Sequence, residues 1–347
     1  LGLSSITASA APPATNVPGS EAIVSKTLAN GLKIIVWPDH DIPNANFYTF
    51  YKVGSRNEYP GITGLAHYFE HMMFNGTTRR APGEFDKQME AAGGSNNAST
   101  SNDLTIYTDW FPSSALETIF DLEGDRMANL SFDPKVIESE RGVVYSERRS
   151  SIDNDNFGTL LEQMQAAAFT AHPYTFPTIG WPSDIEHWKL EDLKKWFKTY
   201  YAPNNAVIVV AGAVRSDSVR AAMRQAFGDI PRGPAITRPA PAAFTVRDTV
   251  LVAEEQGQLP RLYLAWRSVP QYHADDAALN VARYVLSGAR NARLTNALVY
   301  EQEVAKDVFA NNDSKKLDGD FSITATARPG VTLNVLKGAI DKEIRRL

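Results

Sequence analysis

The residues with the clearest chemical potential are His67, Glu70 and His71, which stand close together in the sequence. On an α-helix His67 and His71 project from one face, one turn apart, so that both imidazoles can reach a single ion. Glu70 lies beside the same face. A metal held in this way lowers the pKa of a bound water to about 7 and polarises a carbonyl group. A neighbouring carboxylate can take the proton of that water and pass it to a leaving amine. The three residues are therefore the minimum set for metal-assisted hydrolysis.

The alternative is that two histidines on an amphipathic helix are ordinary core or surface residues. The chain has 6 histidines among 347 residues, and chance produces the pattern H-x-x-E-H only about 0.005 times in such a composition. The metal interpretation is therefore favoured. The sequence contains no cysteine, so we expect any metal to be held by His, Asp or Glu, which are donors that suit zinc.

Two histidines do not complete such a site, because a catalytic zinc usually has three protein ligands. A second predicted helix, over residues 134–150, carries Glu138, Glu140 and Glu147. The spacing of Glu140 and Glu147 places them on the same face of that helix. Spacing and composition do not choose among the three carboxylates, which are equally consistent with a solvated acidic face paired with neighbouring arginines.

Hydrophobic periodicity predicts the elements that must position these residues. We expect two strands joined by a turn at Asn30-Gly31, a strand over 44–56, and a helix over 61–74 with Thr63 as its N-cap. The polar, Thr- and Asn-rich stretch 96–111 predicts one strand at the edge of a sheet. Further helices are expected at 83–92, 113–129, 134–150, 158–170, 191–200 and 216–227, and a buried strand at 206–213.

A Pro-rich stretch predicts a domain boundary. Residues 229–244 contain four prolines, which is typical of an interdomain linker. After it the order of elements begins again, because RLYLAWRSV resembles the strand NFYTFYKVGSR and is followed by a helical pattern. We therefore predict an α+β chain of tandem duplicated α/β sandwich domains, with a metal-binding domain at 21–228 and an incomplete homologous copy at 245–347.

Composition excludes several classes of partner. The net charge is −5 and no basic stripe is present, so we expect no nucleic-acid partner. The longest apolar run, 206–211, is too short for a membrane span. Residues 1–20 resemble the end of a secretory signal, with Ala8-Ser9-Ala10 as a small-x-small cleavage site. This predicts a periplasmic or secreted protein beginning near Ala11; the alternative is a disordered terminus.

The segment His67-Tyr68-Phe69-Glu70-His71 is the inverted zincin motif. Its surroundings, GSRNE before it, TGLAHYFEHMMFNGT around it and GGSNNASTSNDLTIY after it, resemble the insulinase/pitrilysin (M16) family of metallopeptidases. That family includes the mitochondrial processing peptidases. The resemblance extends from about residue 22 to residue 345.

The resemblance implies roles for the residues of the site. Glu147 would be the third ligand, beside His67 and His71, of one zinc ion per chain. Glu140 would be a carboxylate that supports the site from behind the ligands. Glu70 would be the general base that activates the zinc-bound water.

The resemblance also implies a substrate and an architecture. Asn97, Ala98 and Ser99 would pair with an extended peptide by β-strand addition, although Asn97 is also compatible with turn chemistry. In the family, two homologous α+β domains form a half-clamshell, and two halves enclose a chamber that admits unfolded peptides. The implied function is therefore a zinc endopeptidase subunit.

One stretch departs from the family pattern. In single-chain active members the C-terminal half supplies an Arg and, seven residues later, a Tyr that hold the substrate. The matching stretch here has Val299 and Lys306, with Tyr300 out of register. We therefore expect a homologous partner subunit that supplies the Arg and Tyr. Two other functions stay open: a non-catalytic structural subunit of a related complex, and a metal-dependent hydrolase of non-peptide substrates.

Overall fold

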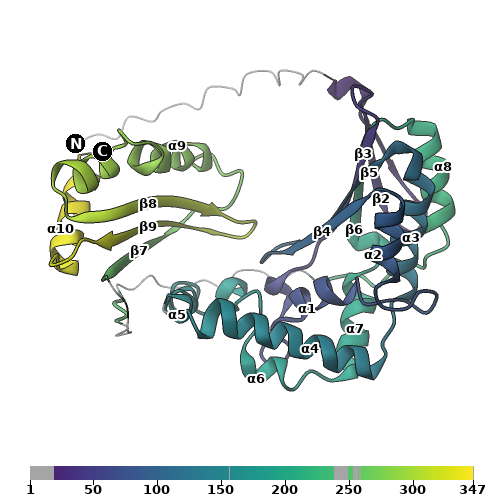
Figure 1. Cartoon of the computed structure of the whole chain (residues 1–347), viewed down its shortest axis with the longest axis horizontal. Helices are drawn as coiled ribbons and strands as arrows, with labels where there is room; N and C mark the ends of the chain where they lie inside the picture. The colour runs from purple at the N-terminus through teal and green to yellow at the C-terminus, as the bar shows by residue number, and fades with distance from the viewer. Residues whose placement is uncertain (1–18, 156, 238–248, 253–256, 258, 347) are drawn as a thin grey trace.

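The computed structural model describes residues 19–155, 157–237, 249–252, 257 and 259–346. Within these ranges the chain forms two α/β parts, each built on its own sheet (Figure 1). No helix in the described ranges is long and apolar enough to cross a membrane. The predicted cleavage site near Ala8 and residues 238–244 of the Pro-rich stretch lie outside the described residues.

The larger part contains a six-stranded sheet in the order β1-β2-β6-β3-β5-β4. Its central strand β3 is half-buried in strict alternation, because Ala45, Phe47, Thr49 and Tyr51 all point to the core. β2 and β6 run parallel and the other neighbours run antiparallel. The strands are β1 (Val24–Thr27), β2 (Lys33–Pro38), β3 (Asn44–Tyr51), β4 (Ser95–Thr100), β5 (Thr105–Pro112) and β6 (Ala206–Gly212).

The segment predicted as one strand over 96–111 is instead a hairpin. β4 and β5 pair in an antiparallel register that joins Thr100 to Thr105, and Ser101–Leu104 form the turn between them. The hydroxyl of Ser101 accepts hydrogen bonds from the amides of Asp103 and Leu104, which closes the turn. The expectation of an edge position was correct, since β4 pairs only with β5 among the described strands.

Eight α-helices accompany this sheet within the described residues. α3 and α8 cover one face (Figure 1), where Phe120 contacts Phe47 edge-to-face and Phe227 stacks on it. α1 and α7 pack near the far end of β3, where Tyr201 contacts both Tyr51 and Phe69. The helices are α1 (Leu65–Met72), α2 (Glu84–Ala91), α3 (Leu116–Asn129), α4 (Pro134–Arg148), α5 (Gly158–Ala168), α6 (Pro182–Ile185), α7 (Leu190–Tyr200) and α8 (Ser216–Phe227).

The start of α1 differs from the prediction that Thr63 is its N-cap. The cap position is Gly64, whose φ of 88° suits glycine and whose missing side chain cannot cap the helix. The buried Glu58 carboxylate takes that role, because it accepts hydrogen bonds from the amides of Gly64 and Ala66, both at 2.8 Å. Thr63 instead donates its hydroxyl to Asp184.

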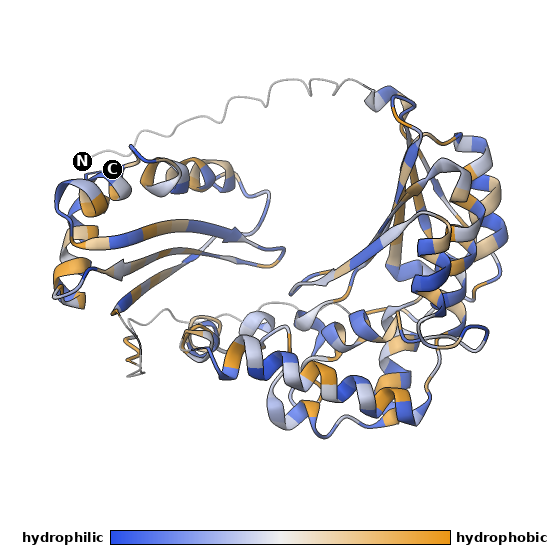
Figure 2. Cartoon of the chain, in the orientation of Figure 1, coloured by the Kyte–Doolittle hydropathy of each residue, from blue (hydrophilic) through white to orange (hydrophobic). Residues whose placement is uncertain are grey.

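The smaller part has a three-stranded antiparallel sheet in the order β7-β9-β8. This order repeats that of β3-β5-β4, with α9 following β7 as α1 follows β3, and α10 following β9 as α3 follows β5. In both parts hydrophobic residues fall in bands along the helices and strands (Figure 2). The elements are β7 (Arg261–Ser268), α9 (Asp276–Ser287), β8 (Ala305–Ser314), β9 (Gly319–Ala327) and α10 (Leu333–Ile344). The predicted α+β class with a repeated α/β arrangement is confirmed.

Candidate metal centre

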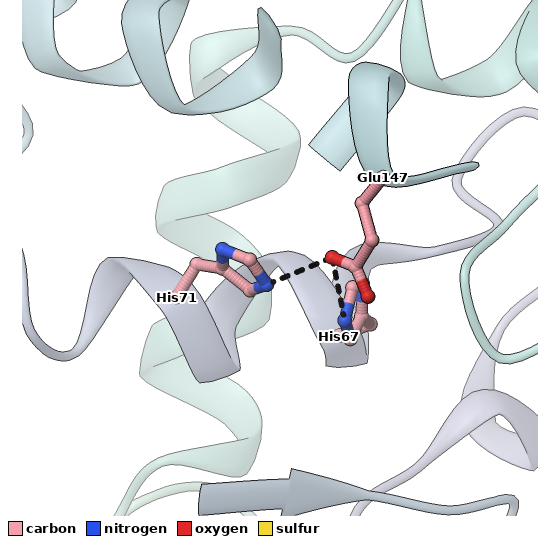
Figure 3. A group of neighbouring side chains, drawn as sticks. All are labelled: His67, His71 and Glu147. Atoms are coloured by element: carbon pink, nitrogen blue, oxygen red, sulfur yellow. Dashed lines mark ion pairs between the residues drawn. The ribbon is translucent and has the colours of Figure 1, made fainter. Parts of the chain in front are cut away.

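Three side chains converge from two helices. His67 and His71 project from α1, and Glu147 projects from the last turn of α4 (Figure 3). One Glu147 carboxylate oxygen lies 3.6 Å from Nε2 of His67 and 3.4 Å from Nε2 of His71. One ligand atom from each residue lies within 4.8 Å of the others. Two imidazole nitrogens and one carboxylate oxygen thus face a common point.

Buried contacts fix α4 against α1. Tyr68, which neighbours His67 on α1, is fully buried and donates its hydroxyl to the carbonyl oxygen of Ile137 on α4 at 2.9 Å. Arg141 donates to the carbonyl oxygens of Ile185 and Trp188 at 2.6 and 2.9 Å, which ties α4 to the end of α6 and to the segment after it. The relative position of the two helices, and hence of the three converging side chains, follows from this packing.

The two histidines are held differently. Nδ1 of His71 lies 2.8 Å from Glu140, which leaves Nε2 facing Glu147. Burial lowers the pKa of His71, but the hydrogen bond and charge of Glu140, followed by the charges of Glu147 and Glu70, outweigh it and raise the pKa above its usual value. Nδ1 of His67 is buried and has no hydrogen-bond partner within the described part of the chain.

Burial, followed by the charge of His71, lowers the pKa of His67 to about 4. His67 is therefore a neutral imidazole near neutral pH, which is the form that binds metals. The carboxylates that raise the pKa of His71 would attract a cation in the same way. The donor set of two nitrogens and one oxygen is a common ligand set of catalytic zinc. These residues therefore fit a zinc ion.

Glu70, also on α1, is not one of the three converging side chains but lies close enough for the charges of His71 and Glu147 to act on it. Its carboxylate accepts a hydrogen bond from the Thr100 hydroxyl at the end of β4. Burial raises the pKa of Glu70, while the Thr100 hydrogen bond and the charge of His71 oppose that rise. Glu70 and His71 line a cavity of about 280 Å³ together with Phe74, Asn75, Asn96, Asn97, Ala98 and Glu140.

Two of the three predicted substrate-binding residues line that cavity. Asn97 and Ala98 form its wall on β4, whereas Ser99 points to solvent and is not part of the lining. Asn97 also accepts a hydrogen bond from the amide of Ala98 through its own side chain. Asn97 therefore lies within a strand and not in a turn, and it lines the cavity.

A larger cavity of about 560 Å³ lies on the other side of the converging side chains. It reaches His67, Thr100 and Glu147, and its walls come mainly from α5 and from residues 177–179. Arg261, from the second sheet, closes part of it. Sequence patterns do not predict this second cavity, because the residues that α5 and 177–179 contribute to it carry no motif and meet only in the folded chain.

The residues at the expected Arg and Tyr positions lie in the smaller part. Val299 packs against its core and accepts a hydrogen bond from Arg328 through its carbonyl oxygen. Lys306 is exposed on β8, and the exposed Tyr300 ring lies 4.8 Å from the Arg290 guanidinium. None of the three lines either cavity described above.

Comparison with known proteins places the chain in a family. Residues 39–180 match the model described as insulinase (peptidase family M16), and residues 187–347 match the one described as the peptidase M16 inactive domain. Every residue of the converging site lies in the first match. The chain is 32% identical over 325 residues to "Zinc protease PqqE" of Helicobacter pylori, covering 92% of this chain and 72% of that protein.

Two further comparisons agree. The chain is 27% identical over 334 residues to "Probable mitochondrial-processing peptidase subunit beta, mitochondrial" of Arabidopsis thaliana, covering 92% of this chain but only 62% of that longer protein. The crystal structure of a protease from Helicobacter pylori superimposes with a TM-score of 0.88 at 30% identity, covering 93% of this chain and 79% of that one. The chain therefore belongs to the insulinase (M16) family of peptidases.

Proposed function

We propose that this chain is the zinc-bearing subunit of an endopeptidase that hydrolyses extended, unfolded peptides. The observation that supports this most directly is the convergence of His67, His71 and Glu147 on one point, with Glu70 beside them. Relatives named as zinc proteases support the same class of activity.

His67, His71 and Glu147 would hold the ion. Zinc, when bound, would supply a Lewis acid that acidifies water and polarises the scissile carbonyl. Glu140 would keep Nε2 of His71 directed at the ion through its contact with Nδ1, so that His71 cannot turn away when the ion leaves.

Glu70 would act as general base. Its carboxylate takes a proton from the attacking water, whose oxygen forms the new bond to the carbonyl carbon, and then gives that proton to the amine as the C–N bond breaks. The Thr100 hydroxyl holds one carboxylate oxygen and thereby limits the directions in which Glu70 can point. Burial raises the pKa of Glu70 and so makes its carboxylate a stronger base.

The substrate would bind as an added strand on the free edge of β4, along Asn97, Ala98 and Ser99. β4 has a single neighbour, β5, among the described strands, which leaves its other edge available for main-chain pairing. The cavity beside Asn97 and the larger one beyond Thr100 lie on either side of the ligand residues, where they can accept side chains that flank the cleaved bond.

A homologous partner subunit would supply the Arg and Tyr, since Val299 and Lys306 offer neither a guanidinium nor a phenol. The two subunits would then enclose a chamber for the peptide.

We also propose that the protein is exported and cleaved after Ala10. N-terminal sequencing of the native protein should then begin near Ala11, whereas a cytoplasmic protein that retains Leu1 would exclude export.

Glu70→Gln tests the assignment. This variant should keep stoichiometric zinc, because Glu70 is not a ligand, and should lose at least ~100-fold in peptide turnover. Glu90→Gln, an exposed carboxylate on the neighbouring helix α2, is the matched control and should retain full turnover. Loss of zinc in Glu70→Gln, or unchanged turnover, would contradict the role. A wild-type protein that binds zinc but cleaves no peptide with or without a partner would favour a non-catalytic subunit.

A further inference from the structure

The tip of the β8–β9 hairpin, which belongs to the smaller part, is bound to the β4–β5 turn of the larger part (Figure 1). The amide of Lys316 donates to the Asp103 carboxylate at 2.9 Å, and the amide of Leu317 donates to the Tyr174 hydroxyl at 2.8 Å. The same hydroxyl lies 2.9 and 3.0 Å from the two Asp103 oxygens and donates to that carboxylate. A tyrosine and an aspartate thus join two loops that are far apart in the sequence.

This contact is partly buried and charge-matched. The Tyr174 side chain is fully buried, and the Asp103 carboxylate also accepts a 2.6 Å hydrogen bond from the nearly buried Arg56. Beside it, Arg267 donates to the carbonyl oxygen of Ala168 at 3.0 Å and forms an ion pair with Asp318 of the hairpin tip. Buried groups with satisfied hydrogen bonds hold a geometry more firmly than exposed ion pairs do.

The β4–β5 turn is also connected to α1, the helix that carries Glu70. Thr100, which donates its hydroxyl to Glu70, is the last residue of β4 and directly precedes the turn. On its other side the turn is held by the amide of Arg56, which donates to the carbonyl oxygen of Asn102, and by the Asn102 side chain, which donates to Ser55. The position of the Thr100 hydroxyl therefore depends on a turn that is fixed partly from the smaller part.

We propose that the β8–β9 tip is a brace, and that Asp103 and Tyr174 are positioning residues that act through the β4–β5 turn to hold Thr100 against Glu70. This inference rests on the proposed function, in which Glu70 is the general base. It predicts that docking of the smaller part changes the rate of the chemical step and not the affinity for zinc.

The test is Tyr174→Phe, which removes the shared hydroxyl and keeps the buried ring. Amide hydrogen exchange should become faster at residues 315–318 and also along 97–104, while zinc affinity stays unchanged. kcat should fall about 10-fold, because a small misplacement of a catalytic group is costly. Tyr284→Phe on α9, an exposed tyrosine of the smaller part, is the control and should alter none of these.

A double-mutant cycle separates the brace from a general structural role. In a Thr100→Val background the hydroxyl that the brace positions is gone, so adding Tyr174→Phe should lower kcat by less than about 2-fold further. Additive losses would overturn the proposal, as would unchanged exchange along 97–104. If Tyr174→Phe does not fold, Asp103→Asn replaces it and is measured in the wild-type and Thr100→Val backgrounds in the same way. The exchange measurement needs no turnover, so it decides the brace even if the proposed peptidase activity fails.

Discussion

Replacing Glu140 by Gln should weaken zinc binding although Glu140 is not a proposed ligand. Its carboxylate lies 2.8 Å from Nδ1 of His71, and its side chain is only 14% exposed. A hydrogen bond to a charged group contributes about 1.5–3 kcal/mol, against about 0.5–1.5 kcal/mol for a neutral pair. The amide that replaces the carboxylate should therefore cost about 1.4 kcal/mol, which is a 10-fold weaker zinc affinity.

Glu138→Gln is the matched control because Glu138 lies on the same helix and is 74% exposed. Glu138 pairs with Arg141 at 3.2 Å, and because the Glu138 carboxylate is exposed to solvent this pair contributes little. Zinc dissociation constants would be measured by competition with a chelator for the wild type and both variants. Glu138→Gln should stay within about 2-fold of the wild type.

Glu147→Gln is the positive control of the same assay, because the loss of a proposed ligand should abolish stoichiometric zinc binding. If Glu140→Gln binds zinc as tightly as the wild type while Glu147→Gln does not bind it, the orienting role assigned to Glu140 is wrong. If both variants bind zinc normally, the ligand set itself is wrong.

Two further predictions concern pH and the partner. His172 is buried beside the hairpin tip and accepts a hydrogen bond from the amide of Tyr174 through Nδ1, and burial, followed by the charges of Arg267 and Lys315, lowers its pKa to about 4. The unfolded chain therefore binds more protons than the native one between about pH 6.5 and pH 4, so the free energy of unfolding should fall with falling pH by at most about 1.4 kcal/mol per pH unit. Urea unfolding at about pH 7 and about pH 5 should show a smaller fall in His172→Asn than in the wild type. An equal fall in both proteins would exclude His172 as the cause. The isolated chain should bind zinc but turn peptides over about 10²–10³-fold more slowly than with its partner, because removing one oxyanion donor typically costs that much; full turnover by a zinc-loaded monomer or homodimer would end the heterodimer proposal.

Local sequence was sufficient for much of the scaffold. The turn at Asn30-Gly31 and the shared face of His67 and His71 depend only on backbone geometry over a few residues. Alternation in β3 and the length of α4 were predictable for the same reason. Where side-chain chemistry competed with the expected pattern, prediction failed: Ser101 closes a turn inside the stretch predicted as one strand, and Glu58 replaces Thr63 at the start of α1.

Tertiary packing brings two of the three carboxylates of α4 to the histidines. Spacing and composition did not choose among Glu138, Glu140 and Glu147, and only the family resemblance assigned Glu147 as a ligand. The packing of α4 on α1 points Glu138 to solvent, Glu140 to Nδ1 of His71, and Glu147 to the ligand point. The contacts of Thr100 with Glu70, and of the β8–β9 tip with Asp103, likewise join elements that periodicity describes separately. Such pairings depend on how buried surfaces of different elements fit together, and a pattern within a single element does not encode that fit.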